Sequence, residues 1–190
     1  AQEAPILHPQ VRRFVAVDDL CRQRCLADGA PADRLSIVHN PVDLLRFVER
    51  PPLPDKPRKA LLLTKTKEQR QAVAVACKAR GIAFDELGSA VGNVAPNLEA
   101  VLPQYDVVFA TARMALEAAA VGCAVIVADG RGVRGMLTSE AWPEWRLQNL
   151  GAALLAEPVT SDALIKALDA YDPKDAAQVT RQVRADADLT

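Results

Sequence analysis

From about residue 59 to the end, apolar runs alternate with stretches of helical periodicity. The apolar runs predict five strands, at residues 59–64, 82–87, 106–110, 124–128 and 152–156. The clearest helical stretches between and after them are 67–80, 113–121, 161–171 and 173–186. Strands that alternate with helices are typical of βαβ units on a parallel sheet. The pattern therefore predicts an α/β domain with a doubly wound parallel sheet.

The first 50 residues differ from this pattern. "RFVAVDD" (13–19) predicts a strand, "LCRQRCLADG" (20–29) a helix that ends at Gly29, and "RLSIVHN" (34–40) a second strand. The stretch "ERPPLPDKPRK" (49–59) contains four prolines, which favour neither helix nor sheet, so it resembles a linker. We therefore expect a boundary here, between residues 1–50 and 51–190. The chain opens on "AQEAPILHP" without Met, and we expect it to be a fragment of a longer protein.

Charge and composition narrow the partners that the chain can have. It has 190 residues, with 23 basic and 24 acidic side chains, so its formal net charge of -1 gives no reason to expect nucleic acid. No apolar run approaches the ~20 residues of a membrane span. The four cysteines lack a second pair at metal-ligand spacing, so we expect free thiols and no metal site. The expected location is the cytoplasm, with peripheral membrane contact through a missing domain left open.

One acidic residue stands out in "TARMALEAAAVG" (111–122), where Glu117 is the only polar side chain between Arg113 and Gly122. Helical periodicity places this carboxylate in an apolar stripe, which is costly unless hydrogen bonds compensate it. Glu117 could simply pair with Arg113 one turn away. However, Arg113 lies in the first turn, where the positive helix end repels a cation. The alternative interpretation is that an anion binds Arg113 and the helix terminus together.

A second helix start shows the same pattern. In "TKTKEQ" (64–69), Thr66 and Gln69 fit a capping box that would begin a helix at Lys67. Lys65 and Lys67 would then lie at the positive end of that helix. Ligands of open α/β sheets bind at this carboxyl edge of the strands, so both lysines are candidate phosphate ligands. The alternative is that they are ordinary solvated lysines.

Two glycine-containing segments are further candidates. Gly88 and Ser89, in "ELGSAVGN" (86–93), form either a turn or a close approach to a flat ring or sugar. The segment "AVIVADGRGVRG" (124–135) carries Gly130-x-Gly132-x-x-Gly135, the spacing of dinucleotide-binding loops.

A dinucleotide loop must lead into a helix, with an acidic residue about 20 positions further on. Glu157 lies near that position, but Trp142-Pro143 interrupts the expected helix, and the motif follows the fourth strand rather than the first. We therefore favour a phosphate or sugar lying against the glycine amides, with Arg131 and Arg134 adding positive charge.

Two segments resemble a known family. Residues 14–47, "FVAVDDLCRQRCLADGAPADRLSIVHNPVDLLRF", are similar to the stretch that joins the two domains of B-type glycosyltransferases of family 4. Residues 105–137, "YDVVFATARMALEAAAVGCAVIVADGRGVRGML", resemble the donor-site core of that family. The resemblance implies transfer of a sugar from a nucleotide diphosphate sugar to an acceptor. It also implies two Rossmann-like domains, of which this chain is the C-terminal, donor-binding one, with the end of the N-terminal acceptor domain.

The resemblance also implies roles for individual residues. Glu117 matches the glutamate that binds the ribose hydroxyls of the donor, and Lys65 or Lys67 would replace the basic pair on the diphosphate. Gly88 and Ser89 would border the base, while Gly130, Gly132 and the amides near Thr111 would lie against the sugar and phosphates. No cofactor and no metal are implied, because helix termini and basic side chains can stabilise a departing diphosphate.

The chain departs from the family pattern at several positions. Phe109 stands where the family usually has a second glutamate, and Ala124 replaces a proline. The Arg and Gly that usually follow the first strand of the domain are missing, and Arg113 is a candidate to compensate. No catalytic residue is assigned, and the fragment alone is expected to be inactive. Two alternatives stay open: an NAD(P)-dependent oxidoreductase that uses Gly130-x-Gly132-x-x-Gly135, or a non-catalytic α/β binding module.

Overall fold

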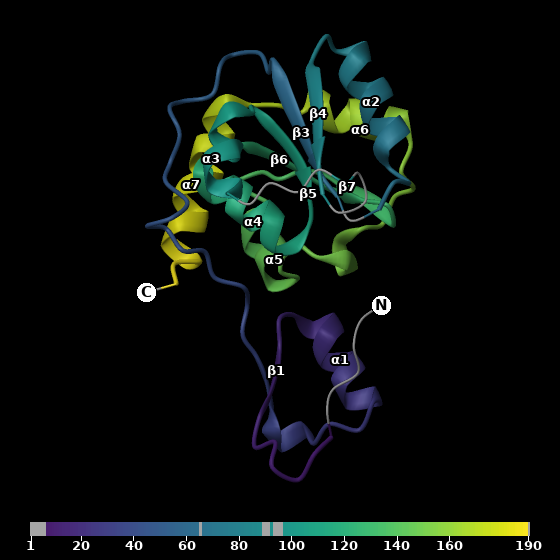
Figure 1. Cartoon of the computed structure of the whole chain (residues 1–190), viewed down its shortest axis with the longest axis vertical. Coiled ribbons are helices and arrows are strands. Elements are labelled where there is room, and N and C mark those ends of the chain that lie inside the picture. Colours follow the sequence, from purple (N-terminus) through teal and green to yellow (C-terminus); the bar gives the residue numbers. More distant parts are fainter. Residues whose placement is uncertain (1–6, 65, 89–91, 93–96, 190) are drawn as a thin grey trace.

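A five-stranded sheet organises most of the chain. The structure is a computed structural model that describes residues 7–64, 66–88, 92 and 97–189. The strands follow the order β4-β3-β5-β6-β7 across the sheet (Figure 1). Their bounds are β3 Lys59–Leu63, β4 Ala83–Leu87, β5 Val107–Ala110, β6 Ala124–Asp129 and β7 Gly132–Met136. The first four are parallel and β7 is antiparallel to β6.

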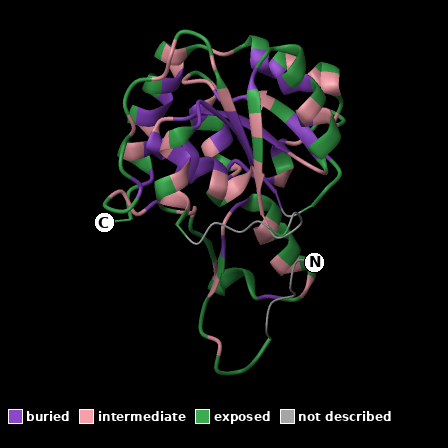
Figure 2. Cartoon of the chain, turned by 45° about the horizontal axis from the view of Figure 1, so that its top comes forward, coloured by how far each residue is buried: buried purple, intermediate pink, exposed green. Residues whose placement is uncertain are grey.

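Helices cover both faces of this sheet. Leu61, Val108 and Val125 point to the face covered by α4 and α7, whereas the alternate residues of the same strands point to the face covered by α2 and α6. The strands β3, β5 and β6 are mostly buried between these layers, whereas the edge strand β4 is partly exposed (Figure 2). The helices are α2 Arg70–Ala79, α3 Leu98–Val101, η3 Leu102–Gln104, α4 Ala112–Val121, α5 Trp142–Leu147, η4 Ala152–Leu154, α6 Ser161–Asp169 and α7 Pro173–Asp186. The prediction of a doubly wound α/β fold is therefore confirmed.

The last predicted strand is wrong. Residues 152–154 form the short 3-10 helix η4, and only Glu157 makes an isolated bridge, to Val133. The physical reason is that β7 folds back and pairs with the edge of β6 that a fifth parallel strand would use. The strands predicted at 59–64, 82–87, 106–110 and 124–128 agree with the structure to within one residue at each end. The two strands predicted at 13–19 and 34–40 are shorter, at Phe14–Ala16 and Leu35–Ile37.

The helix ends follow local chemistry. Gly122 caps α4 with φ of 103°, a left-handed conformation that glycine adopts at low cost. The helix predicted to begin at Lys67 instead begins at Arg70, because Thr66 and Gln69 bond each other rather than the helix amides. Within the described ranges, no helix is both long and apolar enough to cross a membrane.

The N-terminal residues form a separate small unit. It consists of β1 Phe14–Ala16, α1 Asp19–Ala27, η1 Ala32–Arg34 and β2 Leu35–Ile37, and β1 pairs only with β2 among the described strands. The unit lies beside the five-stranded domain (Figure 1). The chain then joins the large domain before the predicted boundary at residue 50. The Val42 amide donates to the Ala187 carbonyl at 2.7 Å, and the Arg50 amide to the Val121 carbonyl at 2.8 Å.

Candidate functional site

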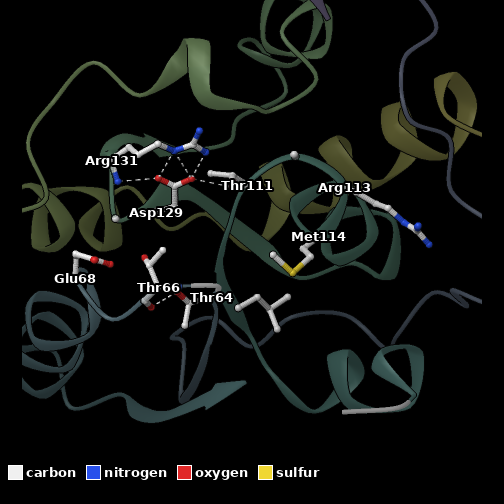
Figure 3. Close-up of a pocket in the computed structure, with 11 residues that line it drawn as sticks. Thr64, Thr66, Glu68, Thr111, Arg113, Met114, Asp129 and Arg131 are labelled. Atoms are coloured by element: carbon white, nitrogen blue, oxygen red, sulfur yellow. Dashed lines mark hydrogen bonds and ion pairs between the residues drawn. The ribbon is translucent and has the colours of Figure 1, made fainter. Parts of the chain in front are cut away.

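A pocket of about 590 Å³ opens at the carboxyl ends of β3, β5 and β6. Three segments converge on it: the end of β3 and the loop after it, the start of α4, and the turn between β6 and β7 (Figure 3). The described residues that line it are Leu63, Thr64, Thr66, Glu68, Thr111, Ala112, Arg113, Met114, Asp129, Gly130 and Arg131. This is the edge at which open α/β sheets bind ligands.

The first turn of α4 borders this pocket. Within the described part of the chain no side chain caps the helix, since Thr111 donates its hydroxyl to Asp129 Oδ2 at 3.2 Å instead. The Ala112 amide donates to the Leu150 carbonyl at 2.8 Å. The next two residues, Arg113 and Met114, line the pocket. First-turn N–H groups have no partner inside a helix, so these amides and the positive helix end suit an anion.

The backbone at this helix start is strained. Ala112 has φ of 52°, in the left-handed region that costs a residue with a Cβ roughly 1–2 kcal/mol. Leu150, which accepts its amide hydrogen, has φ of 50°, and the neighbouring Asn149 has φ of 53°. Strained residues of this kind concentrate at functional sites, and this cluster reaches the pocket through Ala112.

The anomalous glutamate of α4 has a partner in the structure. Arg113 Nε lies 2.7 Å from Glu117 Oε1, so the simpler of the two interpretations holds for this pair. The Glu117 side chain is 7% exposed and that of Arg113 is 68% exposed. Arg113 extends away from the centre of the pocket (Figure 3), and Glu117 is not among the described lining residues. Of the two alternatives, the ion pair between Arg113 and Glu117 is the one that the structure contains.

The loop after β3 is held by its own side chains. Gln69 is 1% exposed; its Nε2 donates to Thr64 Oγ1 at 2.6 Å, and its Oε1 accepts from Thr66 Oγ1 at 3.0 Å. The predicted capping box is therefore wrong. Lys67 is exposed, precedes α2 and is not among the described lining residues. Lys65 lies outside the described residues.

Close contacts within the fold explain why glycine occupies the candidate positions 88, 130 and 132. A Cβ on Gly88 would lie 1.7 Å from the Thr64 carbonyl oxygen, so the backbone contact with Thr64 by itself requires glycine there. A Cβ on Gly132 would lie 2.9 Å from the Glu157 carbonyl oxygen. Gly130 lines the pocket and touches Thr66, whose hydroxyl would be 2.6 Å from a Cβ. Of these three, only Gly130 lines the pocket; Ser89 lies outside the described residues.

The dinucleotide-like spacing does not form a dinucleotide loop. Gly130 lies in a tight turn, and Gly132 and Gly135 belong to β7, which pairs antiparallel with β6. A dinucleotide loop needs a helix directly after the glycines, so this motif lacks the element whose N-terminus would hold the pyrophosphate. Arg134 points elsewhere, over the ring of Trp145 at 5.2 Å.

Sequence reasoning missed the acidic residues of the pocket, above all Asp129. Its Oδ1 accepts from the Arg131 amide at 2.8 Å and from Arg131 Nε at 3.1 Å. Burial by itself would raise the pKa of Asp129, but the hydrogen bonds and charge of Arg131 outweigh it and the pKa is lowered. The available signal was Asp129-Gly130 between two apolar runs, a common hairpin turn. Glu68, on the facing loop, was missed as well.

The described residues contain no cluster of three or more His, Cys, Asp or Glu side chains placed to hold a metal ion. The structure has free thiols at Cys21, Cys25, Cys77 and Cys123. Burial raises the pKa of the Cys123 thiol to about 12.

Together, the mostly parallel sheet, the helices on both faces and the pocket at the carboxyl edge match a Rossmann-like domain of the B-type glycosyltransferase fold. A solved structure of HepE from Anabaena, in complex with UDP and glucose, is similar to this chain with a TM-score of 0.64. The two are 14% identical, and the match covers 93% of this chain and 59% of that one. At this identity the similarity shows the fold. No family model and no curated protein matches the sequence.

Proposed function

We propose that the chain is the donor-binding part of a glycosyltransferase, which transfers a sugar from a nucleotide diphosphate sugar to an acceptor. The observation that carries this proposal is the pocket at the uncapped start of α4, at the carboxyl edge of the sheet. The similar fold of HepE, solved with UDP and glucose, supports the same class of ligand. Membership of family 4 is part of the proposal.

The diphosphate would bind at the amides of Arg113 and Met114. A helix N-terminus binds phosphate through such amides and through its dipole. Arg131 on the facing turn, together with Lys65 or Lys67 before α2, would add positive charge. These groups would stabilise the departing diphosphate without a metal ion.

The nucleoside would extend along α4 towards Glu117. Glu117 lies one turn beyond Arg113 on the same helix face, and its carboxylate can accept hydrogen bonds from two ribose hydroxyls. Arg113 is mostly exposed and can turn from Glu117 to the diphosphate when the donor binds. Gly88 and Ser89 would then border the base.

The acceptor would bind to another domain of the same protein, with residues 1–50 as the end of that domain. The chain covers only 59% of the HepE chain that it resembles. In the small unit, β1 and β2 pair only with each other among the described strands, and Val15 and Val38 are more than half exposed. An isolated two-stranded sheet is marginally stable in water, so further strands are expected beside it.

Calorimetric titration of the chain with UDP, GDP, ADP and NADH tests the proposal. We expect one of the three diphosphates to bind and NADH not to bind. Binding of NADH alone would support an oxidoreductase, and no binding by any of the four would remove the proposed function.

Glu117→Gln tests the ribose contact. We expect the affinity for the diphosphate to fall about tenfold, the loss of one charge-assisted hydrogen bond. The free energy of unfolding should change by less than about 1 kcal/mol, because the Arg113 partner is largely solvated. Glu144→Gln, at an exposed glutamate on α5, is the matched control and should leave affinity unchanged. Equal affinities in the two variants would exclude Glu117 from the site.

A further inference from the structure

The chain at the end of α5, residues 147–151, lies between the small unit and the five-stranded domain. Helix α5 is on the side of that domain that faces the small unit (Figure 1). Three residues of the 147–151 segment touch the small unit or the chain that leaves it. The contacts are His39 Nε2 at 3.3 Å from the Leu147 carbonyl oxygen, the Asn40 amide donating to Asn149 Oδ1 at 3.2 Å, and Asp18 Oδ2 at 3.3 Å from where a Cβ on Gly151 would lie.

The same segment also holds the start of α4. The Leu150 carbonyl accepts from the Ala112 amide at 2.8 Å. Leu150 is fully buried in the apolar cluster on the α4 and α7 face of the sheet, so close packing fixes the place of its carbonyl. Arg113 and Met114, which follow Ala112, line the pocket, whereas the described lining residues include none from 147–151. The segment therefore reaches the pocket through Ala112.

Three strained residues meet at this contact. Among the described residues other than glycine, only Ala112, Asn149 and Leu150 have positive φ, at 52°, 53° and 50°. Because Asn149 and Leu150 are consecutive and Leu150 bonds Ala112, the three form one connected group. Such conformations persist only where the surrounding structure enforces them. Without the Leu150 carbonyl, Ala112 would relax towards the helical φ of about −63°, which changes the direction in which α4 begins.

Asparagine suits position 149 for two reasons. It adopts the left-handed region more readily than most residues that carry a Cβ. It also supplies a buried acceptor, since Asn149 is 2% exposed and its Oδ1 accepts from the Asn40 amide and from Arg146 Nη1, the latter at 3.5 Å. Both neighbours are donors, so an oxygen is required there. Aspartate would meet both requirements, glycine only the first, and alanine neither.

We propose that Asn149 is a positioning residue of the pocket. Through Leu150 it holds Ala112 in the left-handed conformation that sets the first turn of α4, and through Asn40 it ties that turn to the small unit. This inference rests on the proposed function. It adds a residue that does not line the pocket but on which the affinity for the diphosphate depends.

Amide hydrogen exchange, followed residue by residue by NMR, tests the contact without a ligand. We expect exchange at the Ala112 amide to accelerate at least about tenfold in Asn149→Ala, because the Leu150 carbonyl is no longer held in place. Ile165→Ala is the control, since it removes packing on the α2 and α6 face of the sheet. It should lower the unfolding midpoint but change exchange at Ala112 by less than about twofold.

Calorimetric titration then tests the effect on the pocket. The ligand is whichever of UDP, GDP and ADP binds the parent chain, and each variant is titrated at a temperature at which it is fully folded. We expect affinity to fall about tenfold in Asn149→Ala and about threefold in Asn149→Gly, which keeps the left-handed backbone. Asn149→Asp keeps both features and should stay within about twofold of the parent, as should Ile165→Ala.

The outcomes separate this inference from the proposed function. If no diphosphate binds the parent, the proposed function fails and this inference fails with it. If the diphosphate binds the parent and Asn149→Ala equally well, only this inference is overturned. It is also overturned if exchange at Ala112 is the same in the parent and Asn149→Ala, or if Asn149→Asp loses as much affinity as Asn149→Ala.

Discussion

The starts of α2 and α4 look alike in sequence but differ in the structure. Each follows a parallel strand, each is preceded by a threonine at the strand end, and each has a cation nearby. Before α2, the side chains of Thr64, Thr66 and Gln69 bond one another. At α4, Thr111 bonds across to Asp129 and does not cap the helix, and Arg113 and Met114 of the first turn line the pocket.

This comparison shows that cations at a helix start do not by themselves make an anion site. What matters is whether local side chains satisfy the loop or leave its amides open. The loop before α2 therefore lines one side of the pocket, and we expect the ligand to bind at the start of α4. Four measurements examine that difference.

The largest effect is expected from Gly88→Ala, which disturbs the backbone contact between Gly88 and Thr64 before α2. A Cβ there would lie 1.7 Å from the Thr64 carbonyl oxygen, at φ of 146°. Because backbone atoms must move, we expect a loss of more than about 3 kcal/mol in the free energy of unfolding. Gly81→Ala is the control, since its φ of 66° is also left-handed but nothing lies within 4 Å of the new Cβ. Denaturant titration giving the same loss for both would contradict the close contact.

Gln69→Ala removes the side chain that satisfies the loop before α2. We expect about 2 kcal/mol of destabilisation, because Thr64 and Thr66 lose their buried partner. Gln71→Ala, at an exposed position one half-turn along the same helix, should cost less than about 0.5 kcal/mol. Thermal unfolding of the two variants makes the comparison; a Gln69 variant as stable as the control would mean that the network contributes nothing.

Ala112→Gly relieves the strain at the start of α4. Glycine accepts the left-handed φ of 52°, so we expect a stabilisation of about 1 kcal/mol. Ala115→Gly, in the interior of the same helix, should instead destabilise by about 1 kcal/mol. Opposite signs in chemical unfolding would confirm that strain is stored at α4, whereas two losses would place Ala112 in a relaxed conformation.

The smallest effect is the pH dependence contributed by Asp129. Its pKa is lower in the folded chain, so its charged form stabilises the fold at neutral pH. That contribution is present above the ordinary aspartate pKa of about 3.9 and is lost as the pH falls through the folded value. The stability difference between the parent and Asp129→Asn should therefore be constant near pH 6 and shrink below about pH 4. A constant difference across that range would show that Asp129 keeps an ordinary pKa.

Much of the fold follows from local patterns. The parallel strands and the helices α2, α4, α6 and α7 were predicted because apolar runs and helical periodicity persist over whole elements, whereas the short helices α3 and α5 were not predicted. Gly122 directly follows the predicted helical stretch 113–121 and caps α4. The error at residues 152–156 arose because an apolar run does not reveal that another strand already occupies the neighbouring edge.

The candidate site was predictable only in part. Thr111, Arg113, Gly130 and Arg131 were identified and line the pocket, because residues at the carboxyl ends of strands and at helix starts can be found from the sequence. Asp129 and Glu68 were missed because acidic residues in turns are common and only their meeting across Gly130 gives them a shared pocket. The sequence also left two alternatives for Arg113, a pair with Glu117 or binding of an anion. The structure was needed to show the pair.

The sequence by itself determined the order of strands and helices and the place of Glu117 within an apolar helix, because these depend on periodicity along a few neighbouring residues. The tertiary structure decided that the glycine-rich segment folds back as β7 and that the start of α4 is open while the start of α2 is closed. Those outcomes depend on hydrogen bonds between residues far apart in the chain, such as Thr111 with Asp129 and Ala112 with Leu150.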